Sequence, residues 1–209
     1  MDSSPSPLRR LRDVPVFPLP KVVLYPGVML PLYIFEERYK LMVSQALRGD
    51  RRIAISMMRP GEEGVVLGRV CGLGEIVEVK ELEEGERNIV VRGVARIAIE
   101  EVSQNIPYIR AGATLLEETA CAPGTRAARV REIVRIAQQL VFMLDPGNAT
   151  RLISLLSFMD DPSFLTDFVA FYLLQDETVK QELLDTLDVE ARLRRVSDVL
   201  QQALAGLDR

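Results

Sequence analysis

The sequence predicts an α+β protein in which a small, partly closed β-barrel with one inserted helix precedes a helical bundle. From Val14 to about Glu118 apolar residues recur mostly at every second position, and glycine and proline punctuate the chain. After Gly124 the apolar period becomes helical, and proline stands only at predicted helix boundaries. We therefore expect a flexible N-terminus at residues 1–12, a β domain at 13–120 and a helical domain at 124–209.

The clearest strand lies in "NIVVRGVARIAIEEV", residues 88–102. Alternate residues from Ile89 to Ile99 share an apolar face, whereas Arg92, Arg96 and Glu100 fall on the opposite face. Gly93 predicts a bend or bulge that lets this strand serve two regions of the sheet. Further strands are expected in "RRIAISMM", in "YIRAGATLLEE" and in a hairpin that closes on "EEGER".

An apolar stretch, "LYPGVMLPLYIF", runs from residue 24 to residue 35. Pro26 and Gly27 predict a turn into a strand, and Pro31 fits an edge position that needs no backbone N–H. Phe35 is expected to begin the inserted helix, and Gly49 to end it. Residues at helical spacing are assigned to packing of this helix, namely Phe35, Tyr39, Met42, Val43 and Leu47.

About five helices are expected after the linker "ETACAPGTR". The first, at residues 125–144, carries an apolar face made of Val130, Ile133, Val134, Ala137, Leu140, Val141 and Leu144. A short apolar helix follows in "NATRLISLLSFM". Asp161, Asp176 and Asp188 are predicted N-caps of the last three helices, with Pro162 in the first turn after Asp161. These helices would pack as a bundle.

Composition argues against several classes of function. The formal net charge is −4, so no general attraction to nucleic acid or anionic lipid is expected. The absence of histidine excludes the usual catalytic triads, and no P-loop or nucleophile elbow is present. Cys71 and Cys121 lack metal-ligand spacing and fit a reducing cytoplasm, while no apolar run is long enough to cross a membrane. We expect no catalytic residue, cofactor or metal.

Three short patterns have competing interpretations. The glycines of "GLGEIV" indicate backbone geometry in a strand rather than dinucleotide binding, because the third glycine is missing. The acidic run "ELEEGE" at 81–86 is typical of a solvated hairpin tip rather than a calcium loop. Arg69, Arg92 and Arg96 indicate either an RNA-binding stripe or a solvated face paired with carboxylates. These carboxylates are Glu75, Glu78 and Glu100.

Ordered blocks of the first half resemble the Lon N-terminal substrate-binding domain, in particular bacterial proteins that carry this domain alone. The blocks are "VPVFPLPKVVLYPGVMLPLYIFEERYKLMVSQAL", "RIAISMM", "LGRVCGLGEIVEV" and "NIVVRGVARIAIEEV". The resemblance implies a pseudo-barrel related to the PUA fold, followed by a helical bundle. It also implies binding of protein substrates, without the ATPase motor or the Ser/Lys protease domain of Lon, whose motifs the sequence lacks.

We therefore expect a non-catalytic module that binds unfolded or client polypeptides, with a protease or chaperone as a further partner and no membrane. Tyr25, Met29, Tyr33 and Met58 are the candidate contact residues, and burial in the barrel core or in a domain interface is the alternative for each of them. An RNA-binding module and a Ser/Lys or carboxylate hydrolase stay open as alternatives of other classes.

Overall fold

The computed structural model describes residues 10–61, 64–121, 123–144, 146–147 and 149–207. The chain divides into two compact units, the first ending at Glu117 and the second beginning at Glu118. Of the predicted flexible N-terminus, residues 1–9 lie outside the described residues, and Arg10 to Arg12 belong to the first strand.

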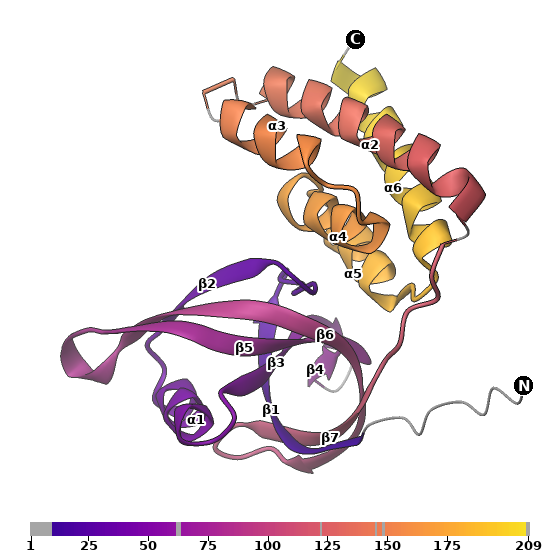
Figure 1. The fold of residues 1–209 in the computed structure, drawn as a ribbon. Helices are drawn as coiled ribbons and strands as arrows, with labels where there is room; N and C mark the ends of the chain where they lie inside the picture. The colour runs from indigo at the N-terminus through magenta and orange to yellow at the C-terminus, as the bar shows by residue number, and fades with distance from the viewer. Residues whose placement is uncertain (1–9, 62–63, 122, 145, 148, 208–209) are drawn as a thin grey trace, which may run out of the picture. The chain divides into compact units, whose positions relative to one another are not determined.

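The described part of the first unit holds seven strands, one α-helix and one 3₁₀ turn (Figure 1). They are β1 (Arg10–Pro20), β2 (Met29–Ile34), α1 (Glu37–Arg48), β3 (Arg52–Gly61), β4 (Gly64–Leu67), β5 (Val70–Glu81), η1 (Glu83–Gly85), β6 (Arg87–Gln104) and β7 (Ile109–Leu115). The strand order is β1-β7-β6-β5-β3, and a parallel pairing of β1 with β3 closes this path into a barrel. The predicted barrel with one inserted helix is confirmed.

The barrel is filled by small and branched apolar side chains. The buried cluster consists of Val14, Val16, Ala54, Cys71, Leu73, Ile97, Ala111 and Ala113. They come from β1, β3, β5, β6 and β7, so each strand of the closed path contributes to one core. Cys71 is part of this core, and its Sγ lies 3.1 Å from the carbonyl oxygen of Gly68.

Strand β6 serves two regions of the sheet, as its length and its glycine predict. Its first part, from Arg87 to Arg92, pairs with β2, and its later part, from Ile97 to Gln104, pairs with β7. Gly93 lies between these parts, next to a register shift against β5. Strand β2 pairs with no other described strand, so its outer side is a sheet edge and Pro31 stands on it.

The connection between β1 and β2 lies directly on three glycines. A Cβ atom built on Gly72 would be 2.0 Å from the carbonyl oxygen of Leu24, and one built on Gly93 would be 1.9 Å from that of Tyr25. At Gly74 the Leu24 side chain is 2.8 Å away. The glycines of "GLGEIV" are therefore explained by close backbone approach, as expected.

The burial of Arg96 contradicts one prediction about β6. Both interpretations of Arg96, an RNA-binding stripe or a solvated face, require an exposed side chain, but Arg96 is only 2% exposed. Its guanidinium carbon lies 5.8 Å from the centre of the Tyr25 ring, and Tyr25 belongs to the segment that lies on this part of the sheet. The alternation along β6 is as predicted, but the connection between β1 and β2 covers the predicted polar face at Arg96.

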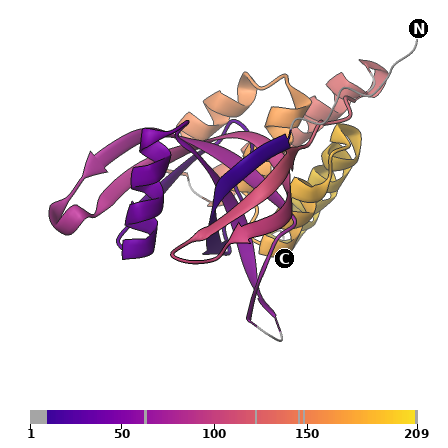
Figure 2. The ribbon, with the colours of Figure 1, turned by 90° about the horizontal axis from the view of Figure 1, so that it is seen from below.

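Helix α1 begins later than predicted. Its N-cap is Glu36, which has an extended backbone, and the helix starts at Glu37. Phe35 therefore precedes the helix and is 56% exposed, so its assignment to helix packing was wrong. Tyr39, Met42 and Val43 are buried as expected, whereas Leu47 is partly buried. Seen from below in Figure 2, α1 lies beside the long β5–β6 hairpin.

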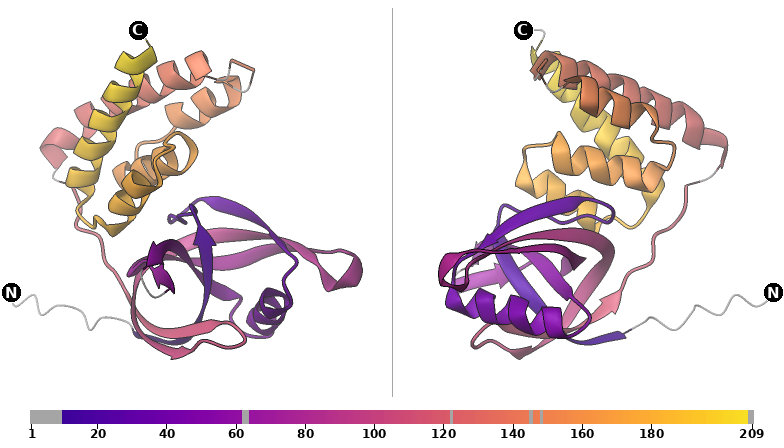
Figure 3. Two further views of the ribbon diagram at one scale, coloured as in Figure 1. Left: turned by 180° about the vertical axis from the view of Figure 1, so that it is seen from behind. Right: turned by 60° about the vertical axis from the view of Figure 1, so that its left-hand side comes forward.

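The described part of the second unit contains five helices, in agreement with the expected number. They are α2 (Pro123–Leu144), α3 (Ala149–Ser157), α4 (Pro162–Tyr172), α5 (Glu177–Asp185) and α6 (Val189–Leu207). Figure 3 shows α2 and α6 running along each other. The predicted apolar face of α2 is buried except at Val134, which is partly buried, and Leu144, which is exposed. No described helix combines the length and the apolar character needed to cross a membrane.

All three predicted aspartate N-caps are confirmed. The Asp161 carboxylate accepts a hydrogen bond from the backbone N–H of Phe164, at 2.7 Å. Asp176 accepts from Thr178 and Val179, and Asp188 accepts from two N–H groups in the first turn of α6. These bonds satisfy backbone donors that have no partner within the helix.

Candidate functional site

The first unit carries an apolar groove of about 650 Å³. Its walls come from the end of β1, the end of β2, the start of α1 and single residues of β3, β4 and β7. The lining residues are Phe17, Pro18, Leu19, Pro20, Leu32, Tyr33, Ile34, Phe35, Glu36, Arg38, Tyr39, Met58, Leu67 and Ile109. Apolar and aromatic side chains dominate, as in sites that accept apolar groups from a ligand.

Two aromatic pairs shape this groove. Phe17 and Tyr39 form its buried part, with ring centres 4.2 Å apart. Tyr33 and Phe35 form its exposed part, with ring centres 5.6 Å apart and exposed fractions of 52% and 56%. The guanidinium carbon of Arg38 stands 4.5 Å from the centre of the Tyr39 ring. The groove is therefore built on a fixed aromatic base with two aromatic rings open to solvent.

Tyr33 connects the groove to the tip of the β5–β6 hairpin. Its hydroxyl donates a hydrogen bond to the Glu86 carboxylate. This bond raises the pKa of Tyr33 above 10.0, and the nearby charges of Glu86 and Glu84 raise it further. The phenol therefore stays protonated at neutral pH and remains a donor, with two carboxylates in electrostatic range.

The edge of β2 offers backbone groups next to the groove. The backbone N–H of Gly93 donates to the carbonyl of Val28 at 2.9 Å, and the antiparallel register continues from there along β2. In such a ladder, every second residue exchanges hydrogen bonds with the partner strand, and the residues between them point their N–H and C=O groups outward. The outward residues of β2 are Met29, Pro31 and Tyr33.

The structure brings some of the predicted contact residues together. Tyr33 and Met58 both line the groove, and Met29 lies on the same face of β2 as Tyr33 and is 45% exposed. Tyr25 is completely buried, so its side chain is not available to a partner in this conformation. Phe35, which sequence reasoning placed inside the helix, is instead a prominent part of the groove.

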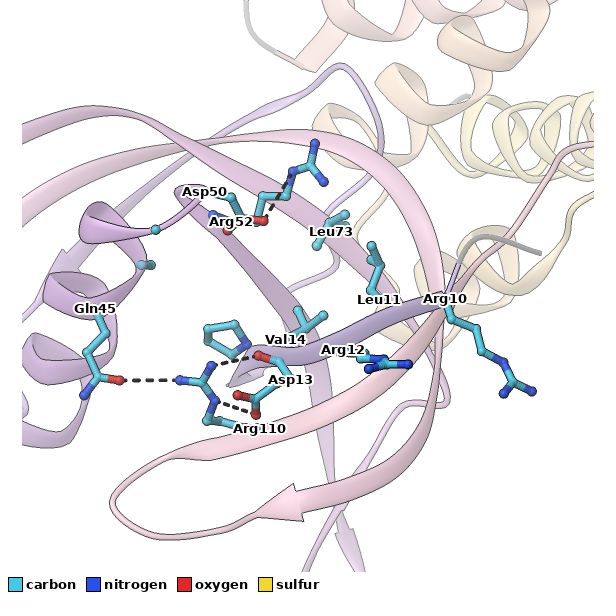
Figure 4. A pocket seen from close by; sticks show the side chains of 13 residues that line it. Arg10, Leu11, Arg12, Asp13, Val14, Gln45, Asp50, Arg52, Leu73 and Arg110 are labelled. Carbon is cyan, nitrogen blue, oxygen red and sulfur yellow. Dashed lines mark hydrogen bonds and ion pairs between the residues drawn. The ribbon is translucent and has the colours of Figure 1, made fainter. Parts of the chain in front are cut away.

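A second pocket, of about 450 Å³, lies where β1 passes the end of α1 (Figure 4). Arg110 donates from Nε to the Asp13 carboxylate at 2.7 Å and from a terminal nitrogen to the Tyr108 hydroxyl at 2.9 Å. The bond to Asp13 raises the pKa of Arg110 above its ordinary value. Figure 4 shows Arg110 directed toward Asp13 and Gln45, whereas Arg10 points away from them. This cluster holds the β1 bulge against β7 rather than offering a free cation.

The three arginines of the predicted RNA-binding stripe do not form one surface. Arg92 is exposed, but its guanidinium pairs with Glu75 at 2.7 Å, as the solvated-face interpretation predicts. Arg96 is buried, and Arg69 lines a different pocket together with Glu100. The geometry therefore favours ion pairing over phosphate contact at these positions.

No three His, Cys, Asp or Glu side chains of the described segments lie close enough together to hold a metal ion. Neither Cys71 nor Cys121 is in a disulfide. The chemistry that the groove can offer is therefore apolar contact, a phenol donor, carboxylates and the backbone groups of an edge strand.

Comparisons with known proteins agree along nearly the whole chain. The ATP-dependent protease La (LON) substrate-binding domain family matches residues 13–202. Lon protease of Roseiflexus castenholzii is 30% identical over 207 residues, which are 96% of this chain and 26% of that protein. Lon protease of Dictyoglomus thermophilum is 27% identical over 93% of this chain and 25% of its own length. The chain thus spans about a quarter of the curated relatives that it matches.

Two solved structures with the same fold are also N-terminal domains. The N-terminal domain of Lon protease from the Mycobacterium avium complex aligns with a TM-score of 0.72 at 22% identity, covering 91% of this chain and 98% of that one. The Lon N-terminal domain protein from Xanthomonas campestris aligns with a TM-score of 0.65 at 20% identity, covering 89% and 97%. At these identities the likeness concerns the fold alone.

Proposed function

Because the chain belongs to the family of the ATP-dependent protease La (LON) substrate-binding domain, we propose that it binds segments of polypeptide in the apolar groove and catalyses no reaction on them. The client in this proposal is an unfolded or partly unfolded protein. Any cleavage or refolding of a bound client is assigned to a separate protease or chaperone. The family description supports binding as the role of this region.

The observation that carries the proposal is the exposed aromatic pair at the mouth of the groove. Tyr33 and Phe35 are each more than half exposed, next to a groove lined mainly by apolar side chains. Moving one large apolar side chain from water into such a site contributes about 1.5–3 kcal/mol. A client side chain that enters the groove also covers these two rings, so both partners lose apolar surface to water.

Strand addition to β2 is the second component of the proposed binding. The outward N–H and C=O groups of Met29 and Tyr33, together with the carbonyl of Pro31, offer hydrogen bonds to an extended client. Backbone hydrogen bonds do not depend on the client's side chains, which suits a module that holds varied sequences. Pro31 supplies no N–H, and this limits unwanted pairing between copies of the edge.

Fluorescently labelled casein, a largely unfolded protein, is the probe for a binding test by fluorescence anisotropy with the full chain. We expect the double variant Tyr33→Ala/Phe35→Ala to weaken binding by at least about tenfold, equivalent to ~1.4 kcal/mol. The matched control is Phe142→Ala, which removes an exposed ring of α2 in the other unit. Unchanged affinity in the double variant would overturn the assignment of the groove.

Peptides cut from the bound regions of casein test the strand addition separately. N-methylation at alternate residues removes backbone donors from one edge of the peptide and leaves its side chains in place. We expect one of the two alternating methylation patterns to abolish binding and the other to be tolerated, because only one edge of an added strand faces β2. Equal affinity for both patterns would show that binding does not use the edge.

A further inference from the structure

A rim of carboxylates lies at the tip of the β5–β6 hairpin, which meets the apolar groove at Tyr33. It consists of Glu83, Glu84 and Glu86, which we call the acidic rim. Tyr33 joins the two features, because its ring lines the groove and its hydroxyl donates to Glu86. Any extended segment that follows the β2 edge past Tyr33 therefore meets the rim.

The cations around the rim are already engaged. Arg38 pairs with Glu36 at 2.8 Å, and Arg87 pairs with Glu81 at 2.8 Å. Lys40 contacts Glu37 at 2.9 Å and donates to the backbone carbonyl of Glu84 at 2.8 Å. The three rim carboxylates, in contrast, form no ion pair with any described residue.

The local charge is correspondingly negative. The segments 36–40 and 81–87 together hold six carboxylates and three cations, a net charge of −3. Further along β5, Glu78 and Lys80 offset each other. A client side chain of positive charge would therefore find carboxylates that form no ion pair next to Tyr33, whereas a client carboxylate would meet like charge.

We propose that the groove and the acidic rim together select client segments in which lysine or arginine stands within a few residues of an apolar anchor. The apolar anchor enters the groove, and the basic side chain reaches Glu83, Glu84 or Glu86. This inference rests on the proposed function, since it specifies the class of polypeptide that the groove accepts. It assigns to the hairpin tip a role in choosing clients, which the fold alone does not require of it.

The acidic rim is expected to affect the choice between client segments more than the overall affinity of binding. An exposed ion pair changes affinity by about fivefold or less, so two basic residues give roughly a tenfold preference at low salt. Salt screens such pairs, and the preference should shrink toward unity at about 1 M, where the Debye length is ~3 Å. Apolar contact in the groove persists under the same conditions.

Three labelled peptides with one shared apolar anchor test this selectivity. Their flanking residues are two lysines, two glutamines or two glutamates, and their dissociation constants for the full chain are measured by anisotropy at low and high salt. We expect the lysine peptide to bind about tenfold more tightly than the glutamine peptide, and the glutamate peptide to bind most weakly.

Two double variants test whether the preference for the lysine peptide depends on the acidic rim. Glu83→Gln/Glu84→Gln neutralises two rim charges and leaves the contact between Tyr33 and Glu86 intact, so we expect most of the lysine preference to disappear. Glu101→Gln/Glu117→Gln makes the same change in net charge at exposed positions outside the rim and should preserve the preference. Circular dichroism confirms that each variant is folded before its affinities are compared.

The outcomes separate this inference from the proposed function. If all three peptides bind with equal affinity and Phe35→Ala abolishes that binding, the groove is the binding site and the selectivity is refuted. Loss of the preference in both double variants would also refute it, because a general field rather than the rim would be responsible. If none of the peptides binds and casein does not bind either, the proposed function and this inference are both overturned.

Discussion

Arg192 of α6 donates a hydrogen bond to Glu118 at 2.6 Å, and 74 residues separate the two in the chain. The Arg192 side chain is fully buried, and a second carboxylate, that of Asp167 in α4, lies 3.6 Å from the same nitrogen. Ser163 accepts a further hydrogen bond from Arg192 at 2.8 Å. One arginine thus joins the first residue of the second unit to two of its helices.

Replacement of Arg192 by methionine should destabilise the second unit strongly. The variant leaves the buried Asp167 and the partly buried Glu118 without their cation, and removal of one partner from a buried pair costs about 3–5 kcal/mol. Urea unfolding, followed by the helical circular dichroism signal, measures this loss. Arg194→Met is the control, since Arg194 makes an exposed pair with Glu190 and should cost less than about 1 kcal/mol. Equal losses in the two variants would contradict this account.

The buried arginines mark a limit of prediction from sequence. Apolar periodicity identified the helices and most strands, though not β1, and residue type at the helix starts identified the aspartate caps, because these features depend on local spacing and local hydrogen bonds. Arg96 and Arg192 lie on positions that the same periodicity assigns to solvent or leaves unassigned. Their burial depends on Tyr25 and Glu118, which are distant in sequence, and no local pattern carries that information.

Gly93→Ala should disturb the first unit, because the added methyl group would stand 1.9 Å from the carbonyl oxygen of Tyr25. Accommodating it requires the β1–β2 connection to move off the sheet, and we expect a loss of about 1–3 kcal/mol or more. Thermal unfolding measures the change.

Gly112→Ala provides the matched control for this substitution. Gly112 lies in the neighbouring strand β7, and the nearest atom to its added methyl group is 3.9 Å away. The control should remain within about 1 kcal/mol of the parent and be slightly stabilised, since alanine restricts the unfolded chain. If Gly93→Ala changes stability as little as Gly112→Ala does, the backbone of Tyr25 does not approach Gly93 closely.

The groove was only partly predictable. The sequence pointed to Tyr33 because it lies in an apolar stretch with a proline-marked edge, and to Met58 because methionine on a strand can adapt to varied partners. It placed Phe35 in the helix, because helical spacing to Tyr39 is satisfied even though the backbone is still extended at Glu36. Further residues of the groove come from β1 and β7, and only the closed barrel brings these near β2.

Tyr25→Ala should mainly reduce stability, whereas Tyr33→Ala should mainly reduce casein binding. Tyr25 is fully buried, so its truncation leaves a cavity and should cost roughly 3–5 kcal/mol of stability. Tyr33 is half exposed, and its truncation should cost less than about 1 kcal/mol while weakening casein binding. Parallel measurements of thermal unfolding and casein anisotropy separate the two effects. A folded, stable Tyr25→Ala variant that fails to bind casein would show that Tyr25 contacts the client.

Lys180 of α5 predicts a dependence of stability on alkaline pH. Partial burial lowers the pKa of its ammonium below the ordinary 10.5, and the charge of Glu177 raises it back only in part. Between this lowered pKa and 10.5 the unfolded chain binds more protons than the folded chain. The contribution of Lys180 to the free energy of unfolding therefore increases as the pH rises through that window.

Lys180→Met removes this titration and Lys180→Arg keeps the charge, so the two variants isolate it. At neutral pH we expect the methionine variant to be more stable than the parent, with the difference shrinking as the pH approaches 10.5 because the parent lysine loses its proton. The arginine variant stays charged and should become less stable than the parent over the same range.

Tyr39 also titrates in this range. Burial raises its pKa and reduces stability above pH 10.0, but all three proteins share this residue, so its contribution cancels in the differences between them. Urea unfolding at a series of pH values measures these differences, and parallel curves for the three proteins would show that Lys180 is equally solvated in the folded and unfolded chains.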